Sequence, residues 1–299
     1  MQNNELSRLT TFKIGGECEQ LFFPEILKEF SELLFELDNP LIIAGGSNLL
    51  ISSLGVKTPV VCTNKLKNLE ITGNKVKAEC GVRGGFLAQA VAKEGLSGFE
   101  FMIAFPGTVG GNLYMNASAH GQFMSDCFVS ANVFDKDLKQ VINLKKEDMN
   151  FAYKQSILQT GRYILLDAEF ELVKKDTSSI QELMERNLSC RKQSQPSMAH
   201  PNAGCAFKNP ENDSAGRLLD KAGMKGFVGN NVKVWDLHAN FIVTTGKATS
   251  TDVLELMLKM YNVVKDTYKI ELEPEIIFVG ERNEREEEIC QLLYPKIQK

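Results

Sequence analysis

The amino-acid sequence predicts an α+β protein. Helical and strand patterns are mixed along all 299 residues, and they do not alternate in the regular strand–helix–strand order of a parallel-sheet protein. Two glycine-rich loops follow apolar runs, and neither loop has the GxGxxG or GxxxxGK[ST] spacing. These observations argue against a Rossmann domain and against a P-loop nucleotide hydrolase.

The predicted elements follow from apolar periodicity and turn residues. Apolar residues at helical spacing predict a helix over residues 26–37, which Asn39-Pro40 ends. Strands are predicted at residues 41–44, 75–80, 128–134, 141–144, 164–173, 240–244 and 271–279, and further helices near residues 87–94, 178–195, 218–222 and 250–264. Ser178 with Gln181, and Thr249 with Asp252, are predicted to cap the helices that follow them.

Composition excludes several classes of function. The net charge of −4 argues against a general nucleic-acid binder, and no apolar run is long enough to cross a membrane. Residues 1–13 lack the apolar centre of a signal peptide. The 7 cysteines are odd in number with no CxxC pair, and the 3 histidines lie far apart, so neither a disulfide framework nor a metal site is expected. A reducing cytoplasm fits this pattern.

The two glycine-rich loops predict a ligand that contains phosphate. Backbone N–H groups exposed by a tight glycine turn can surround phosphate oxygens. Two such loops indicate one large phosphorylated ligand held from two sides, although each loop could also be an ordinary turn between strands. The residues concerned are Ala44, Gly45, Gly46, Ser47, Asn48 and Leu49 in the first loop, and Pro106, Gly107, Thr108, Gly110 and Gly111 in the second.

A change in composition near residues 193–200, towards Gln, Ser and Pro, predicts a domain boundary. We expect residues 1–195 to form the first region. Residues 196–299 form the second region, and the pattern leaves open whether their C-terminal tail packs back on the first subdomain.

Several motifs, in this order, resemble one enzyme family. They are Thr11-Phe12-Lys13-Ile14-Gly15-Gly16, the loop from Ala44 to Leu50, Phe105-Pro106-Gly107-Thr108-Val109-Gly110-Gly111, Met115-Asn116-Ala117, Ala203-Gly204-Cys205-Ala206-Phe207-Lys208-Asn209-Pro210, Ala222-Gly223-Met224-Lys225-Gly226, His238-Ala239-Asn240-Phe241-Ile242-Val243 and Leu272-Glu273-Pro274-Glu275. Each motif is weak alone, but the ordered set is specific. Over nearly its whole length the chain resembles the UDP-N-acetylenolpyruvoylglucosamine reductases, the MurB family of peptidoglycan synthesis.

The resemblance implies a fold, cofactors and a reaction. The implied fold is an FAD-binding region of the vanillyl-alcohol-oxidase type with a C-terminal substrate domain. In that fold residues 1–195 would form two subdomains that divide near residues 55–65. FAD would be bound noncovalently, in agreement with the absence of His and Cys from residues 41–51, and NADPH would be the reductant. The implied reaction reduces the enolpyruvyl ether of a UDP-sugar to a lactyl ether. We expect a cytoplasmic monomer that has no nucleic-acid or membrane partner.

The resemblance also implies the catalytic residues, with two departures from the family pattern. Cys205 occupies the position of the family's usual serine proton donor; a thiol, with an ordinary pKa of about 8.5, is a stronger acid than an alcohol. Lys154 occupies the position of the usual arginine, which keeps the positive charge but loses the planar fork. Glu275 matches the family's catalytic glutamate and is expected on the last strand.

The remaining site residues follow from the same motifs. Asn116 joins the two loops as a cofactor-binding residue, and Tyr153 and Asn209 are expected to bind substrate. Alternative interpretations remain open: Cys205 as an inert buried thiol, Lys154 as a solvated side chain, and Glu275 as part of a salt bridge. The alternative functions are a flavin oxidase of the same fold and a noncatalytic nucleotide-sugar binder.

Overall fold

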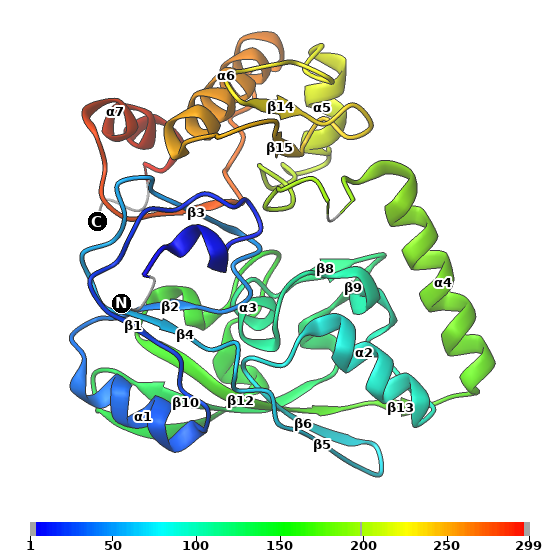
Figure 1. Ribbon diagram of the computed structural model, residues 1–299. Coiled ribbons are helices and arrows are strands. Elements are labelled where there is room, and N and C mark those ends of the chain that lie inside the picture. The colour runs from blue at the N-terminus through cyan, green and yellow to red at the C-terminus, as the bar shows by residue number, and fades with distance from the viewer. Residues whose placement is uncertain (1–3, 198, 296–299) are drawn as a thin grey trace. The chain divides into compact units, whose positions relative to one another are not determined.

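The computed structural model describes residues 4–197 and 199–295 (Figure 1). The chain forms two compact units. Unit 1 consists of residues 1–20, 46–58 and 192–299, and unit 2 consists of residues 21–45 and 59–191. Each unit therefore combines segments that are distant in the sequence, and the division falls within the first glycine-rich loop, between Gly45 and Gly46.

Unit 2 contains two main sheets. The larger has five antiparallel strands in the order β11-β10-β12-β6-β5, and the smaller has three parallel strands in the order β1-β4-β2. The strands are β1 Leu21–Phe22, β2 Leu41–Ile43, β4 Val60–Cys62, β5 Leu69–Thr72, β6 Lys75–Glu79, β7 Leu96–Ser97, β8 Ser118–Ala119, β9 Gln122–Phe123, β10 Phe128–Asp135, β11 Gln140–Lys145, β12 Tyr163–Glu171 and β13 Val173–Lys174. The strands predicted at residues 75–80, 128–134, 141–144 and 164–173 are confirmed.

Helices and sheets of unit 2 share one apolar core. The helices are α1 Leu27–Glu36, α2 Gly84–Lys93, α3 Val109–Tyr114 and α4 Thr177–Ser194, of which α4 continues past Arg191, the last residue of this unit. The 3-10 turns include η2 Glu100–Ala104 and η5 Ile157–Thr160. In the core, Phe170 of β12 contacts Phe99 and Phe128 edge to face, with ring centroids 5.1 and 6.1 Å apart. Edge-to-face packing is the favoured geometry for such rings.

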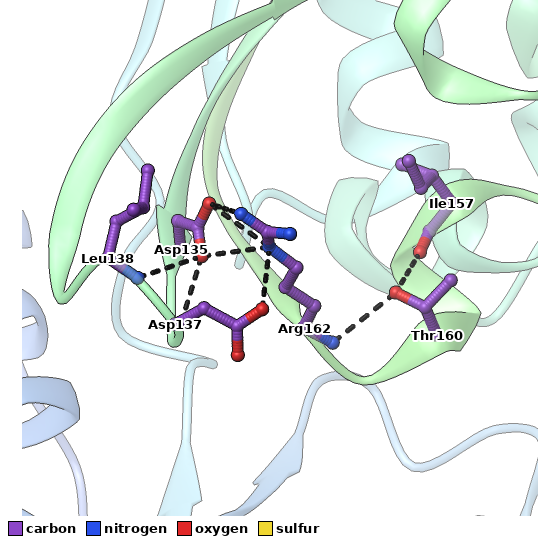
Figure 2. A network of polar contacts seen from close by, with 6 residues as sticks. All are labelled: Asp135, Asp137, Leu138, Ile157, Thr160 and Arg162. Carbon is purple, nitrogen blue, oxygen red and sulfur yellow. Dashed lines mark hydrogen bonds and ion pairs between the residues drawn. The ribbon is translucent and has the colours of Figure 1, made fainter.

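An ion pair closes the β10–β11 hairpin of unit 2. The carboxylate of Asp135 is buried and accepts two hydrogen bonds from the Arg162 guanidinium, at 3.0 Å from Nε and 2.7 Å from Nη2 (Figure 2). It also accepts the backbone N–H groups of Asp137 and Leu138, at 2.9 and 3.2 Å. The guanidinium lowers the pKa of Asp135. The hairpin is thus held by a carboxylate that must be charged to make these bonds.

Unit 1 contains two small sheets and a helical layer. The strands are β3 Leu49–Ile51 and β16 Ile277–Val279, which pair in parallel, and β14 Val232–Val234 and β15 Ile242–Thr244, which pair antiparallel. The helices are α5 Ala215–Lys221, α6 Ser250–Tyr268 and α7 Glu284–Leu293, after η1 Leu6–Leu9 near the start of the chain. Figure 1 shows α6 and α7, in orange and red, lying side by side.

Helix α6 confirms a prediction from the sequence. Thr249 and Asp252 form the expected capping box: the Thr249 hydroxyl accepts the Asp252 N–H at 3.2 Å, and the Asp252 carboxylate accepts the Thr249 N–H at 2.8 Å. The predicted apolar stripe, Val253, Leu256, Met257, Met260 and Val264, is buried in the core of unit 1. Local capping and helical periodicity therefore agree with the tertiary packing here.

Two local predictions were wrong. Helix α4 begins at Thr177, one residue before the predicted range of 178–195. The Asp176 carboxylate caps it by accepting the Ser179 N–H at 3.2 Å, in place of the predicted Ser178 cap. A carboxylate caps a helix at least as well as a hydroxyl does. Because Asp176 comes before Ser178 in the chain, the helix begins earlier. The last strand covers only Ile277–Val279, so the strand predicted for residues 271–276 is absent.

Among the described residues, no helix is long and apolar enough to cross a membrane. The same residues contain no group of three or more His, Cys, Asp or Glu side chains arranged to hold a metal ion.

Candidate active site

The first glycine-rich loop depends on Gly46. This residue is buried and has φ +59°, in the left-handed region that favours glycine. A Cβ atom added to Gly46 would lie 1.9 Å from the carbonyl oxygen of Leu9, which no side chain could tolerate. The Gly46 carbonyl accepts the Thr11 N–H at 3.1 Å. The loop is therefore packed tightly against the N-terminal segment of unit 1.

The start of this loop lies against the second glycine-rich loop, within unit 2. A Cβ atom on Gly45 would be 3.2 Å from Gly107 Cα and 3.3 Å from the Pro106 carbonyl oxygen. A Cβ atom on Gly111 would lie 3.7 Å from Ala44 Cβ. The structure thus brings together two loops that are about 60 residues apart in the sequence, as one ligand held from two sides requires.

Both loops leave polar groups without protein partners. Within residues 4–197 and 199–295, the backbone N–H groups of Gly45, Gly46 and Ser47 donate to no backbone carbonyl. Thr108 Oγ1 is buried and also finds no hydrogen-bond partner in the described part of the chain, and the same holds for Asn112 Nδ2. Buried polar atoms without a partner are costly, so the Thr108 hydroxyl and the Asn112 amide indicate a bound polar ligand.

The second loop is itself rigidly held. The Val109 N–H donates to the Val82 carbonyl and the Gly110 N–H to the Cys80 carbonyl, both at 2.8 Å. These bonds fix the start of α3 beside the end of β6. The predicted residue Gly110 therefore anchors the loop through its backbone N–H.

Lys154 lies on a tight turn of unit 2. Ala152 and Gln155 exchange two backbone hydrogen bonds, both 3.2 Å, with Tyr153 and Lys154 at the tip. Lys154 has φ +55°, an uncommon conformation for a residue other than glycine. Lys154 is half-buried, and Tyr153 is 45% exposed. Such backbone conformations are concentrated at functional sites.

Asn116 is placed to hold this turn. It is buried, its Nδ2 donates to the Ala152 carbonyl at 3.0 Å, and its Oδ1 accepts the Ser125 N–H at 3.1 Å. The side-chain amide is thus bonded to the protein at both ends. Its role as a direct cofactor contact stays a prediction, whereas its support of the turn is visible in these bonds.

Cys205 and Glu275 come together in unit 1. The Ala206 carbonyl, next to Cys205, accepts the Glu275 N–H at 2.8 Å, and the Ala206 N–H donates to the Asn240 carbonyl at 2.8 Å. Cys205 also forms a backbone bridge with Phe241. The Cys205 segment therefore lies between the two segments that carry Glu275 and Asn240, and both predicted catalytic side chains are half-buried.

Asn48 connects the first loop to Glu275. Its Nδ2 donates to the Glu275 carbonyl at 2.9 Å, and its own carbonyl accepts the Ile277 N–H at 3.0 Å. Glu275 precedes β16 and is not part of that strand, contrary to the prediction. Pro274 has no N–H to donate to a neighbouring strand, and the Glu275 N–H is directed to Ala206. These long-range bonds, which the local sequence does not reveal, decide the position of Glu275.

Two neighbouring polar residues are also accounted for. Asn209, a predicted substrate residue, is exposed, and its Oδ1 accepts the Ala215 N–H at the start of α5, at 3.1 Å. Lys208 forms an ion pair with Glu273 at 2.8 Å. Glu273, two residues from Glu275, therefore makes a structural contact with Lys208.

Asn240, whose role the sequence alone did not reveal, holds the Cys205 segment through its side chain and its backbone. Its buried amide accepts the Phe207 N–H at 3.0 Å and donates to the Phe207 carbonyl at 2.8 Å. The sequence indicates this role only by the position of Asn240, a polar residue directly before an apolar strand in the motif from His238 to Val243. A buried asparagine there must find partners for its amide.

Comparison with known proteins places the chain in one family. A family model of an FAD-binding domain matches residues 37–141, and a model of the C-terminal domain of UDP-N-acetylenolpyruvoylglucosamine reductase matches residues 195–279. A UDP-N-acetylenolpyruvoylglucosamine reductase of Caldanaerobacter subterraneus is 38% identical over 284 residues, which cover 94% of this chain and 93% of the relative. One of Bacillus subtilis is 36% identical over 286 residues, with 94% of each covered.

A solved structure agrees with these relatives. The crystal structure of UDP-N-acetylenolpyruvylglucosamine reductase (MurB) from Thermus caldophilus superposes with a TM-score of 0.80 at 31% identity, and the match covers 92% of this chain and 97% of that one. The α+β fold and the FAD-binding region implied by the motifs are confirmed. The chain belongs to the UDP-N-acetylenolpyruvoylglucosamine reductase family of FAD-dependent oxidoreductases.

Proposed function

We propose that the chain reduces the enolpyruvyl ether of UDP-N-acetylenolpyruvoylglucosamine to the lactyl ether of UDP-N-acetylmuramate, a step of peptidoglycan precursor synthesis. The observation that carries the proposal is that Cys205 and Glu275, the two residues matching the family's acid and glutamate, lie on adjacent segments joined by the Ala206–Glu275 hydrogen bond. Relatives of that name match along almost the entire chain. FAD, held by the residues of the glycine-rich loops, would supply the hydride chemistry that connects NADPH with the enolpyruvyl group.

The residues of the two glycine-rich loops fit FAD. Thr108 Oγ1 and the N–H group of Gly45 need acceptors, which the oxygens of a dinucleotide supply. A side chain at Gly45 would crowd the backbone of Pro106 and Gly107 in the second loop. We propose that residues 1–195 bind FAD through Ala44, Gly45, Gly46, Ser47, Asn48, Leu49, Pro106, Gly107, Thr108, Gly110, Gly111 and Asn116, and that residues 196–299 form the substrate-binding region.

Three side chains would carry the proton and the charge. The Cys205 thiol donates a proton to the substrate carbon next to the carboxylate as negative charge develops there. The Lys154 ammonium stabilises that charge on the substrate carboxylate. Glu275 orients the substrate carboxyl group or the proton, held by the Asn48 bond to its carbonyl. Tyr153 and Asn209 would contact the nucleotide sugar.

The partners and the location are part of the proposal. NADPH as the reductant, a monomeric enzyme and a cytoplasmic site rest on the family resemblance and on the cysteine usage of the chain. Size-exclusion chromatography with light scattering tests the monomer. Comparison of NADPH with NADH in flavin reduction tests the reductant.

The decisive experiment follows the absorbance of bound flavin in a rapid-mixing instrument. NADPH should bleach the flavin, and the enolpyruvyl UDP-sugar should restore its absorbance with formation of the lactyl ether. If NADPH-reduced flavin is not reoxidised by this substrate under anaerobic conditions, the proposal fails. Rapid reoxidation by oxygen with turnover of alcohols or sugars would identify a flavin oxidase, and tight sugar binding without reoxidation would identify a binding protein.

A further inference from the structure

The carbonyl groups at the end of α3 all accept hydrogen bonds, and the final one accepts them from side chains, not from the backbone. The three residues that follow the helix donate their backbone N–H groups to its carbonyls: Met115 to Gly111, Asn116 to Leu113 and Ala117 to Asn112. The carbonyl of Tyr114, the last helical residue, instead accepts two side-chain donors from residues 156–159. Helix ends must find such partners, because their last carbonyls have none inside the helix.

The two donors come from the segment that follows Lys154. Ser156 Oγ donates to the Tyr114 carbonyl at 2.9 Å, and Gln159 Nε2 donates to the same oxygen at 2.8 Å. Gln159 Nε2 also donates to the Lys154 carbonyl, at 2.9 Å. One amide group thus links the end of α3 to the backbone of Lys154. The beginning of the same short helix is the second glycine-rich loop.

The backbone conformation of the Lys154 turn is unfavourable without these hydrogen bonds. Lys154 adopts φ +55°, and the two backbone bonds that close the turn are long, at 3.2 Å each. A left-handed conformation is unfavourable for a residue with a side chain, and surrounding contacts maintain it. Asn116 holds the Ala152 carbonyl on one side of the turn, and Gln159 holds the Lys154 carbonyl on the other.

We infer that Gln159 is a positioning residue that fixes the Lys154 ammonium relative to the cofactor loop. Its hydrogen bonds to the Tyr114 and Lys154 carbonyls connect the backbone of Lys154 to the end of α3. Because α3 begins at the second glycine-rich loop, the position of the ammonium is fixed relative to that loop. The inference rests on the proposed role of Lys154. A displacement of a catalytic group by about 1 Å can slow a reaction about 100-fold.

Gln159→Glu is the sharpest test because it changes the amide to a carboxylate of the same size. A carboxylate cannot donate, and it repels the carbonyl oxygens of Lys154 and Tyr114. We expect reduction of the flavin by NADPH within about twofold of the unaltered protein, and reoxidation by the enolpyruvyl UDP-sugar slowed about 10- to 100-fold. Gln159→Met, which removes the donors without adding a charge, should slow reoxidation in the same direction. Gln140→Glu, on the exposed β11, is the control and should change neither step.

A double variant separates this inference from the proposed function. Combined with Lys154→Met, Gln159→Glu should produce no further loss in reoxidation, because it acts through Lys154. The inference is overturned if the two losses multiply, if Gln159→Glu and Gln159→Met leave reoxidation unchanged, or if both half-reactions slow equally. If Lys154→Met alone reoxidises normally, the catalytic role of Lys154 fails first and the inference falls with it. Melting temperature and bound FAD are measured for each variant, so that a loss of folding is recognised.

Discussion

The segments that carry the proposed catalytic groups are held in two different ways. In unit 1, Cys205 lies between neighbours whose backbones are paired to it directly, through Ala206, Glu275 and Asn240. In unit 2, Lys154 lies on a two-residue turn whose carbonyls are held from outside by the side chains of Asn116 and Gln159. Backbone pairing survives most side-chain changes, whereas a turn held by amides depends on single residues. The two segments should therefore respond differently to substitution.

The largest expected effect is on Cys205. Cys205→Ala removes the proposed proton donor, and loss of a general acid typically slows a reaction by about 10²–10⁴. We expect this loss in reoxidation of the flavin by substrate and none in its reduction by NADPH, both measured by rapid mixing. Cys205→Ser should retain substantial activity because the hydroxyl occupies the same place. An equal decrease in both half-reactions would show that Cys205 is not the acid; Cys190→Ala, on the exposed face of α4, is the control.

Asn240→Ala tests whether unit 1 really depends on backbone pairing. The variant leaves the Phe207 N–H and carbonyl without the amide that pairs with them, and an unpaired buried group costs about 1–3 kcal/mol. We expect the free energy of unfolding, measured with urea, to fall by about 2–4 kcal/mol. Gln291→Ala, at an exposed position of α7 in the same unit, should change it by less than about 0.5 kcal/mol. A change for Asn240→Ala as small as that of the control would contradict the proposed clamp.

Arg162→Met probes unit 2 away from the catalytic groups. The Asp135 carboxylate would remain buried without its guanidinium, so the melting temperature should fall by several degrees while the half-reactions stay unchanged. Arg162 lowers the pKa of Asp135 below its value in the unfolded chain, so this stabilisation is complete above pH about 4 and disappears as the pH falls through the folded pKa. The difference in melting temperature should be constant between pH 6 and 8 and shrink in acid. A difference that grows in acid would refute the assignment.

The smallest expected effect comes from Thr108→Val. The hydroxyl has no protein partner in the described chain, so its replacement by a methyl group should leave the melting temperature of the apoprotein unchanged or raised. FAD affinity should fall about fivefold, the equivalent of roughly 1 kcal/mol for one hydrogen bond. Titration of apoprotein by flavin fluorescence measures this loss. Thr72→Val, on the exposed edge strand β5, should leave affinity unchanged; equal affinities for both variants would place the hydroxyl outside the cofactor site.

The sequence alone determined what depends on near neighbours. The apolar stripe and capping box of α6 were predicted correctly because capping and periodicity act over one or two turns. The glycine loops were recognised because glycine favours tight turns, and at Gly46 the close Leu9 carbonyl leaves no space for a side chain. The family, and with it the FAD-binding α+β fold, followed from the order of short motifs.

Only the tertiary structure decided what depends on distant partners. Gly45 meets Gly107, Asn48 holds Glu275, and Gln159 reaches both Tyr114 and Lys154, none of which a local pattern specifies. Glu275 lies outside the last strand because its N–H bonds to Ala206, far earlier in the chain. Local sequence sets backbone preferences of about 1 kcal/mol per residue. Buried polar groups that must find partners outweigh those preferences, and the partners exist only after the chain has folded.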